Sequence, residues 1–196
     1  MLFPEAMEEC YNVARKQNLR RRYRMIDILR KRRSVRKYQA TAIDSQALEV
    51  MKEALLRSPS SRGINPWTFL FVDQKDLLQR LSLAKEQGAQ FVKGAALAIV
   101  VCADETKSDV WIEDCSIASI VAHLMAQSLG LGSCWCQIRG RSHSKEKTAE
   151  KYIQELLHIP GNLRVLSIIG IGVPAETKTP ITKEQLDYTK IRYNTY

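Results

Sequence analysis

The stretch ALAIVVCA, residues 96–103, is a continuous apolar run of strand length. Unbroken runs of this kind are typical of strands that are buried on both faces. A longer apolar segment follows at about residues 112–129, with apolar side chains on more than one helical face. That breadth indicates a helix that is deeply buried or covered by a second subunit. The two segments therefore predict a central strand and a long helix in the core of the fold.

Shorter elements are predicted on both sides of this centre. Helical spacing predicts five further helices, over residues 5–24, 25–31, 47–56, 75–86 and 144–157. Three further strands are predicted, over residues 68–73, 134–138 and 165–174. Asp44 or Ser45 can cap the helix at 47–56, and Gly130 ends the long helix. The polar tail from Glu176 to Tyr196 shows no periodicity, and we expect it to lie along a surface.

Composition places the chain among globular proteins. Its 196 residues are 45% apolar and 26% charged, and no apolar run reaches the roughly 18 residues of a membrane span. The first ten residues, MLFPEAMEEC, are acidic and lack a secretory-signal pattern. Five cysteines form no disulfide-scaffold spacing. We therefore expect reduced thiols and a cytoplasmic protein, with no membrane partner.

The net charge of +9 is concentrated in one arm. Residues 1–37 hold twelve Lys/Arg against four Asp/Glu, a net +8, whereas the other 159 residues hold eighteen against seventeen, a net +1. A basic arm can bind polyanions, form a solvated helix face or pack on an acidic patch of a partner. The solvated face is the preferred interpretation, and nucleic acid is the weaker one. We predict a basic helical arm over 1–24 and one domain over 25–196.

The segment RRSVR, residues 32–36, is a candidate anion site. If it is extended, alternation puts Arg32, Ser34 and Arg36 on one face, with Arg33 on the opposite side or on a turn. Two guanidinium groups and a hydroxyl on one face suit a phosphate. On composition alone, a stretch of basic arm that binds no ligand is the preferred interpretation.

The segment SPSSRGINPW, residues 58–67, crowds polar groups against the start of a predicted strand. Its donors and acceptors match the edge of a heteroaromatic ring, and Gly63 allows close approach of the backbone. The candidate residues are Ser60, Ser61, Arg62 and Asn65. The alternative is a helix-to-strand loop with serine turn chemistry and no ligand.

Several common sites are not expected. In GLGSCWCQIRGR, residues 130–141, a helix leads into a strand, which is the reverse of the order in a dinucleotide-binding fingerprint. Cys134 and Cys136 have no second pair at metal-ligand spacing, and the three histidines are scattered, so no metal site is expected. The sequence also lacks the short motifs of serine hydrolases, P-loop NTPases and zinc metalloproteases.

Four stretches in this order resemble the FMN-dependent nitroreductase family: RRSVRKY, SPSSRGINPWTFLFV, the long apolar helix ending in GLGSCWCQI, and VLSIIGIGVPAE. The resemblance runs from about residue 25 to the C-terminus. It implies an α+β fold with a mixed or antiparallel sheet wrapped by helices. It also implies an intertwined homodimer with two FMN sites at the interface.

The resemblance also implies roles for particular residues. Around the ribityl-phosphate it implies Arg32, Arg33, Ser34 and Arg36, with Lys178 completing the site from the tail. Near the flavin ring or ribityl chain it implies Ser60, Ser61 and Arg62, contributed across the dimer, and near the flavin N5 it implies Gln137 and Ile138. Many family members read Asn-x-Gln-Pro-Trp where this chain has Gly63 and Asn65, so ring contacts must come from Arg62, Asn65 or backbone.

The implied activity is an FMN-dependent NAD(P)H oxidoreductase with no catalytic side chain, because the flavin carries the redox chemistry. NADH or NADPH would deliver a hydride to flavin N5 and leave before a nitroaromatic, a quinone or a similar electron-poor acceptor takes it. Reductive dehalogenation uses the same scaffold. A flavin-binding sensor without turnover, and a polyanion-binding protein led by the basic arm, stay as alternatives.

Overall fold

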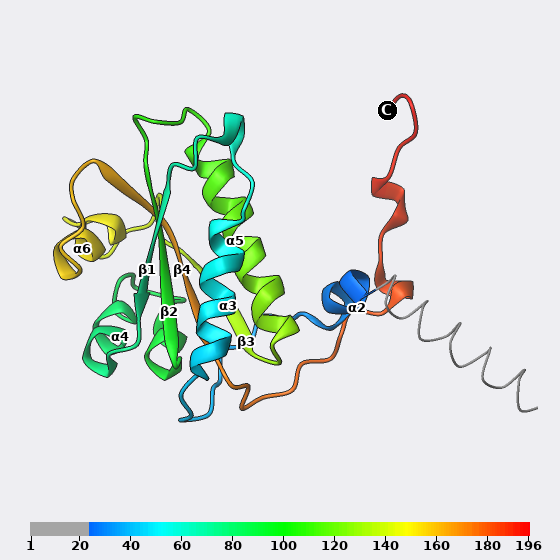
Figure 1. Cartoon of the computed structure of the whole chain (residues 1–196), viewed down its shortest axis with the longest axis horizontal. Coiled ribbons are helices and arrows are strands. Elements are labelled where there is room, and N and C mark those ends of the chain that lie inside the picture. The colour runs from blue at the N-terminus through cyan, green and yellow to red at the C-terminus, as the bar shows by residue number, and fades with distance from the viewer. Residues whose placement is uncertain (1–23) are drawn as a thin grey trace, which may run out of the picture. The chain divides into compact units, whose positions relative to one another are not determined.

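The computed structural model describes residues 24–196, which divide into two compact units (Figure 1). The larger unit is Arg33–Thr179. The described part of the smaller unit is residues 24–32 together with residues 180–196. The predicted helix over residues 5–24, and almost all of the basic arm, lie outside the described residues.

The larger unit is built on a four-stranded sheet in which every pair of neighbouring strands is antiparallel. The strands are β1 (Trp67–Val72), β2 (Leu97–Asp104), β3 (Gly132–Gln137) and β4 (Leu163–Gly172), in the order β1-β2-β4-β3. All eight residues of β2 are buried, which confirms the central strand predicted at residues 96–103. The strands predicted at 68–73, 134–138 and 165–174 are confirmed as β1, β3 and β4.

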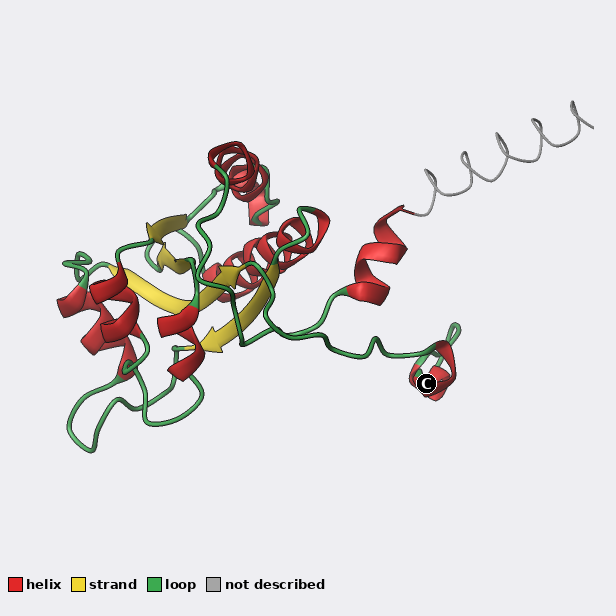
Figure 2. Cartoon of the chain, turned by 90° about the horizontal axis from the view of Figure 1, so that it is seen from below, coloured by secondary structure: helices red, strands yellow, loops and turns green. Residues whose placement is uncertain are grey.

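Helices cover both faces of this sheet (Figures 1 and 2). One face carries α3 (Ser45–Leu56) and α5 (Trp111–Ser128), and the other carries α4 (Lys75–Leu81) and α6 (Ala149–Leu156). The strand β2 serves both hydrophobic clusters because its side chains alternate. Ile99 and Val101 pack on the α3–α5 side, and Val100 and Cys102 pack on the α4–α6 side. The α+β fold with a helix-wrapped sheet is therefore confirmed.

The helix α5 meets the sheet with small side chains. Its buried residues include Cys115, Ala118, Ser119, Ala122 and Ala126. Small residues let a helix axis approach its neighbour closely, so α5 contacts all four strands and α3. Gly130, with φ of +74°, follows the end of α5, as the sequence predicts.

The helix predicted over residues 75–86 is wrong in its second half. The helix α4 ends at Leu81, and the Ser82 hydroxyl donates to the carbonyl of Gln79 at 2.6 Å. The amides of Leu83 and Ala84 then donate to the carbonyls three residues earlier, those of Arg80 and Leu81, which tightens the chain into turns. Leu81 and Ala84 are buried through these turns, so the apolar spacing continues where the helix does not.

The helix predicted over residues 144–157 is wrong in its first part, because α6 begins only at Ala149. Thr148 caps α6 by accepting a hydrogen bond from the Lys151 amide at 3.1 Å. Before it, the Ser144 hydroxyl accepts from the amides of Glu146 and Lys147, which offers the backbone a turn in place of a helix.

The smaller unit contains α2 (Arg24–Lys31), which confirms the helix predicted over residues 25–31, and two short 3₁₀ turns. The turns are η3 (Lys183–Gln185), which has a capping box between Thr182 and Gln185, and η4 (Tyr188–Lys190). The unit exposes many large apolar side chains: Met25, Ile26, Leu29, Ile181, Leu186, Tyr188, Ile191, Tyr193 and Tyr196.

In the larger unit the segment 33–39 lies directly on β3. A β-carbon added to Gly132 would stand 2.7 Å from Cγ1 of Val35, and Val35 is itself buried. A β-carbon at Gly172 would stand 3.0 Å from Cδ1 of Tyr38. The absence of side chains at these two strand positions is therefore what lets the segment seat against the sheet.

We expect Gly132→Ala to destabilise the protein by about 1–3 kcal/mol, because its methyl group overpacks Val35. The control is Gly161→Ala, since a β-carbon at Gly161 meets nothing within 4 Å. Urea denaturation of both variants measures the difference. Equal stability of the two variants would contradict close seating of the segment on β3.

Candidate functional site

The first candidate region is the segment 33–39, which lies between β3 and the chain that follows β4. Ser34 pairs with Ser133 in a parallel bridge, and the Val35 amide donates to the Ser133 carbonyl at 3.0 Å. On its other side, the Gln39 amide donates to Val173 O and the Ala175 amide donates to Lys37 O, both at 2.9 Å. The backbone that carries the predicted phosphate residues is therefore fixed by the sheet.

Glu176 lies against this segment. Its Oε1 accepts hydrogen bonds from the amides of Arg36 at 2.7 Å and Lys37 at 3.2 Å, and its Oε2 pairs with Lys178 Nζ at 2.8 Å. The hydrogen bond from Lys178, followed by that from the Arg36 amide, lowers the pKa of Glu176 to about 2. Two amides and an ammonium group thus already converge on one anionic group, the carboxylate of Glu176.

The predicted phosphate residues take different directions. Burial raises the pKa of the Cys134 thiol, and Arg36 and Ser34 each act to lower it. Arg33 instead donates to the carbonyl of Thr179. Arg32 belongs to the smaller unit, where its amide donates to Ile28 O at 2.8 Å.

The second candidate region is the loop Ser60–Asn65 at the other end of α5. Its backbone turns through left-handed angles at Arg62 (φ 55°), Gly63 (φ 66°) and Asn65 (φ 53°). Ser60 Oγ accepts from the Asn65 amide at 2.8 Å and donates to Asn65 Oδ1 at 2.7 Å. The Ser61 amide donates to Asp114 Oδ1 at 2.7 Å. The serine and asparagine side chains therefore hold the turn itself.

Two buried polar atoms flank this loop without a hydrogen-bond partner in the described chain, Ser58 Oγ and Trp67 Nε1. Buried polar atoms are nearly always paired, so each unpaired one needs a physical explanation. Both atoms border the segment for which the sequence predicts a ligand edge.

The third candidate region is the end of β3. Gln137 is partly exposed, accepts from Trp135 Nε1 at 3.1 Å and donates to the Arg139 carbonyl at 3.0 Å. Ile138 is fully buried in the hydrophobic cluster, and its amide donates to Leu166 O at 3.0 Å. Of the two residues predicted here, only Gln137 has a partly exposed side chain.

The helix α5 separates the first two regions. Asp114 holds Ser61, and His123 Nδ1 lies 2.7 Å from the hydroxyl of Ser133, where segment 33–39 is seated. Nine residues separate Asp114 from His123, which corresponds to roughly 14 Å along a helix axis. Within a single chain, the two regions therefore sit at different heights on α5.

Sequence reasoning missed three residues of these regions: Asp109, Asp114 and Glu176. Asp109 pairs with Arg62, Asp114 holds the loop through Ser61, and Glu176 pairs with Lys178. Asp114 carried one available signal, because it is a charged residue inside an otherwise apolar helical pattern.

The described part of the chain holds no group of three or more His, Cys, Asp or Glu side chains that could bind a metal ion. Its four cysteines, Cys102, Cys115, Cys134 and Cys136, are free and buried. Burial raises the pKa of Cys136 to about 11, so this thiol stays protonated at neutral pH. Across residues 24–196, no helix combines the length and apolar character needed to span a membrane.

We expect Glu176→Gln to destabilise the protein at pH 7, with a difference from the wild type that shrinks as pH falls. The folded pKa lies below the usual value of 4.5, so the carboxylate stabilises the fold above that value. This contribution is lost as pH falls from 4.5 toward about 2. Urea denaturation across this pH range measures it, with Glu146→Gln as an exposed control. A difference that stays constant with pH would contradict the expectation.

The family model described as "Nitroreductase family" matches residues 29–111 and 84–173. A curated protein of Archaeoglobus fulgidus with the provisional name NADH dehydrogenase/NAD(P)H nitroreductase is 36% identical over 151 residues, which cover 75% of this chain and 83% of that protein.

Among solved structures, an FMN-dependent nitroreductase from Clostridium difficile R20291 is 44% identical, with a TM-score of 0.86. The match covers 87% of this chain and 99% of that one. The NADPH:FMN oxidoreductase from Vibrio harveyi, solved with NAD⁺, has a TM-score of 0.72 at 23% identity, with 88% and 77% covered. The similarity to the Vibrio harveyi structure supports the fold alone.

Proposed function

This chain belongs to the nitroreductase family and is an oxidoreductase, and from that premise we propose that it binds FMN and passes a hydride from NADH or NADPH to a small electron-poor acceptor. Nitroaromatics and quinones are the proposed acceptors. FMN, when bound, supplies the redox chemistry, so the chain needs no acid–base or nucleophilic side chain of its own. Donor and acceptor would occupy the same site in turn, which gives ping-pong kinetics.

The observation that carries the proposal is the anion-binding geometry around Glu176. The amides of Arg36 and Lys37 and the ammonium of Lys178 already converge on a carboxylate. Burial raises the pKa of the Cys134 thiol, and the charge of Arg36 and the side chain of Ser34 oppose that rise. Amide, hydroxyl, ammonium and guanidinium donors together form the set that a phosphate ester requires. We propose that the phosphate of FMN would bind these donors in place of the Glu176 carboxylate, with Arg32 and Arg33 completing the set.

The loop Ser60–Asn65 fits the other end of the cofactor. It presents hydroxyls, an amide side chain and the exposed guanidinium of Arg62. We assign Ser60, Ser61, Arg62 and Asn65 to the flavin ring or ribityl chain, with Gln137 at the reactive edge of the ring. A cation at Arg62 would stabilise negative charge on the ring edge. Ile138 would contribute only by supporting Gln137 from the core.

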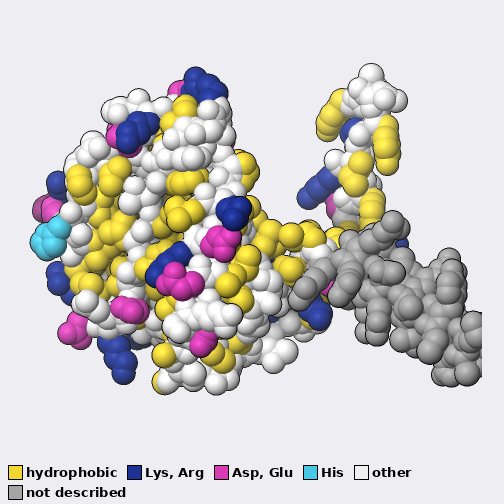
Figure 3. Space-filling model, viewed as in Figure 1, with side chains coloured by type: hydrophobic (Ala, Val, Ile, Leu, Met, Phe, Trp, Pro, Cys, Tyr) yellow, Lys and Arg dark blue, Asp and Glu magenta, His cyan; other side chains and the backbone are white. Residues whose placement is uncertain are grey.

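A homodimer would bring the two ends of the site together. The helix α5 exposes Ile117 (39%) and Ile120 (43%) while its small residues face the sheet, so its larger apolar surface needs a cover. Figure 3 shows hydrophobic side chains exposed at several places on the larger unit. In one chain, the segment 33–39 and the loop Ser60–Asn65 are separated along α5. A second copy would therefore supply the loop Ser60–Asn65 that contacts the flavin ring.

The purified protein should be yellow and show flavin absorbance bands. Under anaerobic conditions, stopped-flow mixing with NADH or NADPH should bleach these bands, and adding a quinone or nitroaromatic should restore them. Colourless protein that takes up no FMN would refute the cofactor assignment. Bound FMN that neither nicotinamide bleaches would favour a flavin-binding sensor instead.

Arg36→Ala should weaken FMN binding by about tenfold to a hundredfold, because a charge-assisted hydrogen bond to the phosphate is lost. Arg80→Ala, on the exposed side of α4, removes the same charge away from the site and is the control. Fluorescence titration of apoprotein with FMN at two salt concentrations measures both variants. Unchanged affinity for Arg36→Ala would remove this residue from the phosphate site.

A further inference from the structure

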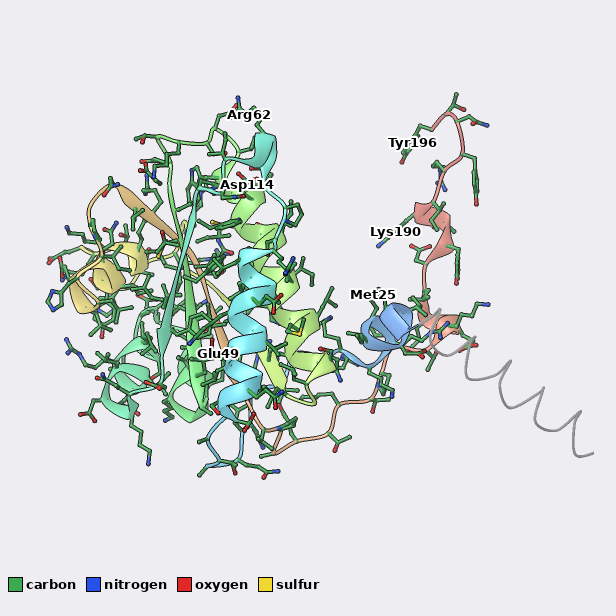
Figure 4. All side chains as sticks on the ribbon, viewed as in Figure 1. Met25, Glu49, Arg62, Asp114, Lys190 and Tyr196 are labelled. Atoms are coloured by element: carbon green, nitrogen blue, oxygen red, sulfur yellow. The ribbon has the colours of Figure 1, made fainter. Side chains whose placement is uncertain are left out.

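We propose that Asp114 is a positioning residue, which holds the loop Ser60–Asn65 in the conformation that receives the flavin ring. The inference rests on the proposed function and extends it to a residue that would not itself touch the cofactor. Figure 4 places Asp114 on α5 at the same end of the molecule as Arg62.

The burial of Asp114 is the first observation. Its exposed fraction is 1%, although carboxylates are rarely buried without a role for their charge. Its Oδ1 accepts the Ser61 amide at 2.7 Å, and its Oδ2 accepts the Ser108 hydroxyl at 2.9 Å. The two oxygens thus bind two different connections, the loop before β1 and the loop after β2.

The backbone of the loop is the second observation. Arg62 and Asn65 both adopt left-handed angles, which cost free energy in residues that carry a β-carbon. The two hydrogen bonds between Ser60 and Asn65 close the turn but do not attach it to the rest of the protein. An external contact must therefore fix where the strained turn lies, and the Ser61 amide provides one.

The weakness of the alternative attachment is the third observation. Arg62 also pairs with Asp109, but the two side chains are 63% and 76% exposed. Exposed ion pairs contribute about 0–1 kcal/mol, because water and salt screen them. The hydrogen bond to Asp114 is partly buried, and its acceptor is 1% exposed, so water and salt screen it less than the ion pair. We therefore assign the positioning role to Asp114 and leave Arg62 available for the cofactor.

Ser108 ties a second segment to the same carboxylate. This segment follows β2, whose last residue, Asp104, donates its amide to the carbonyl of Pro66 at 3.1 Å. Both ends of the loop Ser60–Asn65 are therefore fixed to the same neighbourhood, at Ser61 through Asp114 and at Pro66 through Asp104. A change at Asp114 would release the Ser61 end and leave the other end attached.

The test compares Asp114→Ala with Asp114→Asn. Alanine removes both acceptors, whereas asparagine can accept the Ser61 amide through its oxygen and donate to the Ser108 hydroxyl through its nitrogen. Glu113→Ala removes an exposed carboxylate from the neighbouring position of α5 and is the matched control.

Three measurements follow each variant: FMN affinity by fluorescence titration, the visible circular dichroism of bound FMN, and the rate of tryptic cleavage after Arg62. Asp114→Ala should weaken FMN binding about tenfold or more, as loss of a hydrogen bond to a charged group predicts. It should also alter the visible dichroism and speed cleavage at Arg62. Asp114→Asn should stay close to the wild type, and so should Glu113→Ala.

A second pair of variants tests the same bond from the loop side and does not depend on the folding of Asp114→Ala. Ser61 has helical backbone angles and follows an extended residue, so proline fits there and deletes only the amide and the hydroxyl. Ser61→Ala deletes the hydroxyl alone. A further loss of FMN affinity from Ser61→Ala to Ser61→Pro isolates the amide that Asp114 accepts.

The outcomes separate the two proposals. If wild-type protein binds FMN but Asp114→Ala retains its affinity and dichroism, the positioning role is overturned and the proposed function stands. Equal FMN affinity of Ser61→Pro and Ser61→Ala overturns it as well. If wild-type protein binds no FMN, the proposed function is overturned, and the cofactor role of Asp114 falls with it.

Discussion

The close approach of α5 to the sheet is the constraint on which the other parts of the candidate site depend. Small side chains such as Ala118 and Ala122 line the buried face of this helix, so its polar residues come within hydrogen-bonding distance of neighbouring loops. Asp114 reaches the Ser61 amide and His123 reaches the Ser133 hydroxyl. Larger residues on this face would push the helix outward and break both contacts.

The same packing leaves two large apolar side chains of α5, Ile117 and Ile120, exposed. In the proposed dimer, a second copy would cover these two exposed side chains. The helix that contacts the loop Ser60–Asn65 through Asp114 and the strand β3 through His123 is also the surface on which a second copy would pack.

Much of this fold could be predicted because its signals are local. The unbroken run at 96–103 predicts a strand buried on both faces, and the structure confirms it as β2. Asp44 caps α3 with two hydrogen bonds, as the residue type suggests. Two predicted helices extend too far, over residues 82–86 and 144–148. Serine hydroxyls form hydrogen bonds with backbone groups there, and the apolar spacing of the sequence does not show that competition.

The site was harder to predict because its contacts join residues far apart in the chain. RRSVR and SPSSRG point to donors for an anion and a ring, but neither motif reveals that Glu176 pairs with Lys178, or that Asp114 accepts the Ser61 amide. The sequence does contain one indication of the second contact, because Asp114 is a charged residue within an otherwise apolar helix. Burying a carboxylate costs free energy that only strong partners can offset, so such a residue marks a place where the chain fixes a second segment. Here that segment is the loop assigned to the flavin ring, which makes its geometry depend on a residue outside the loop.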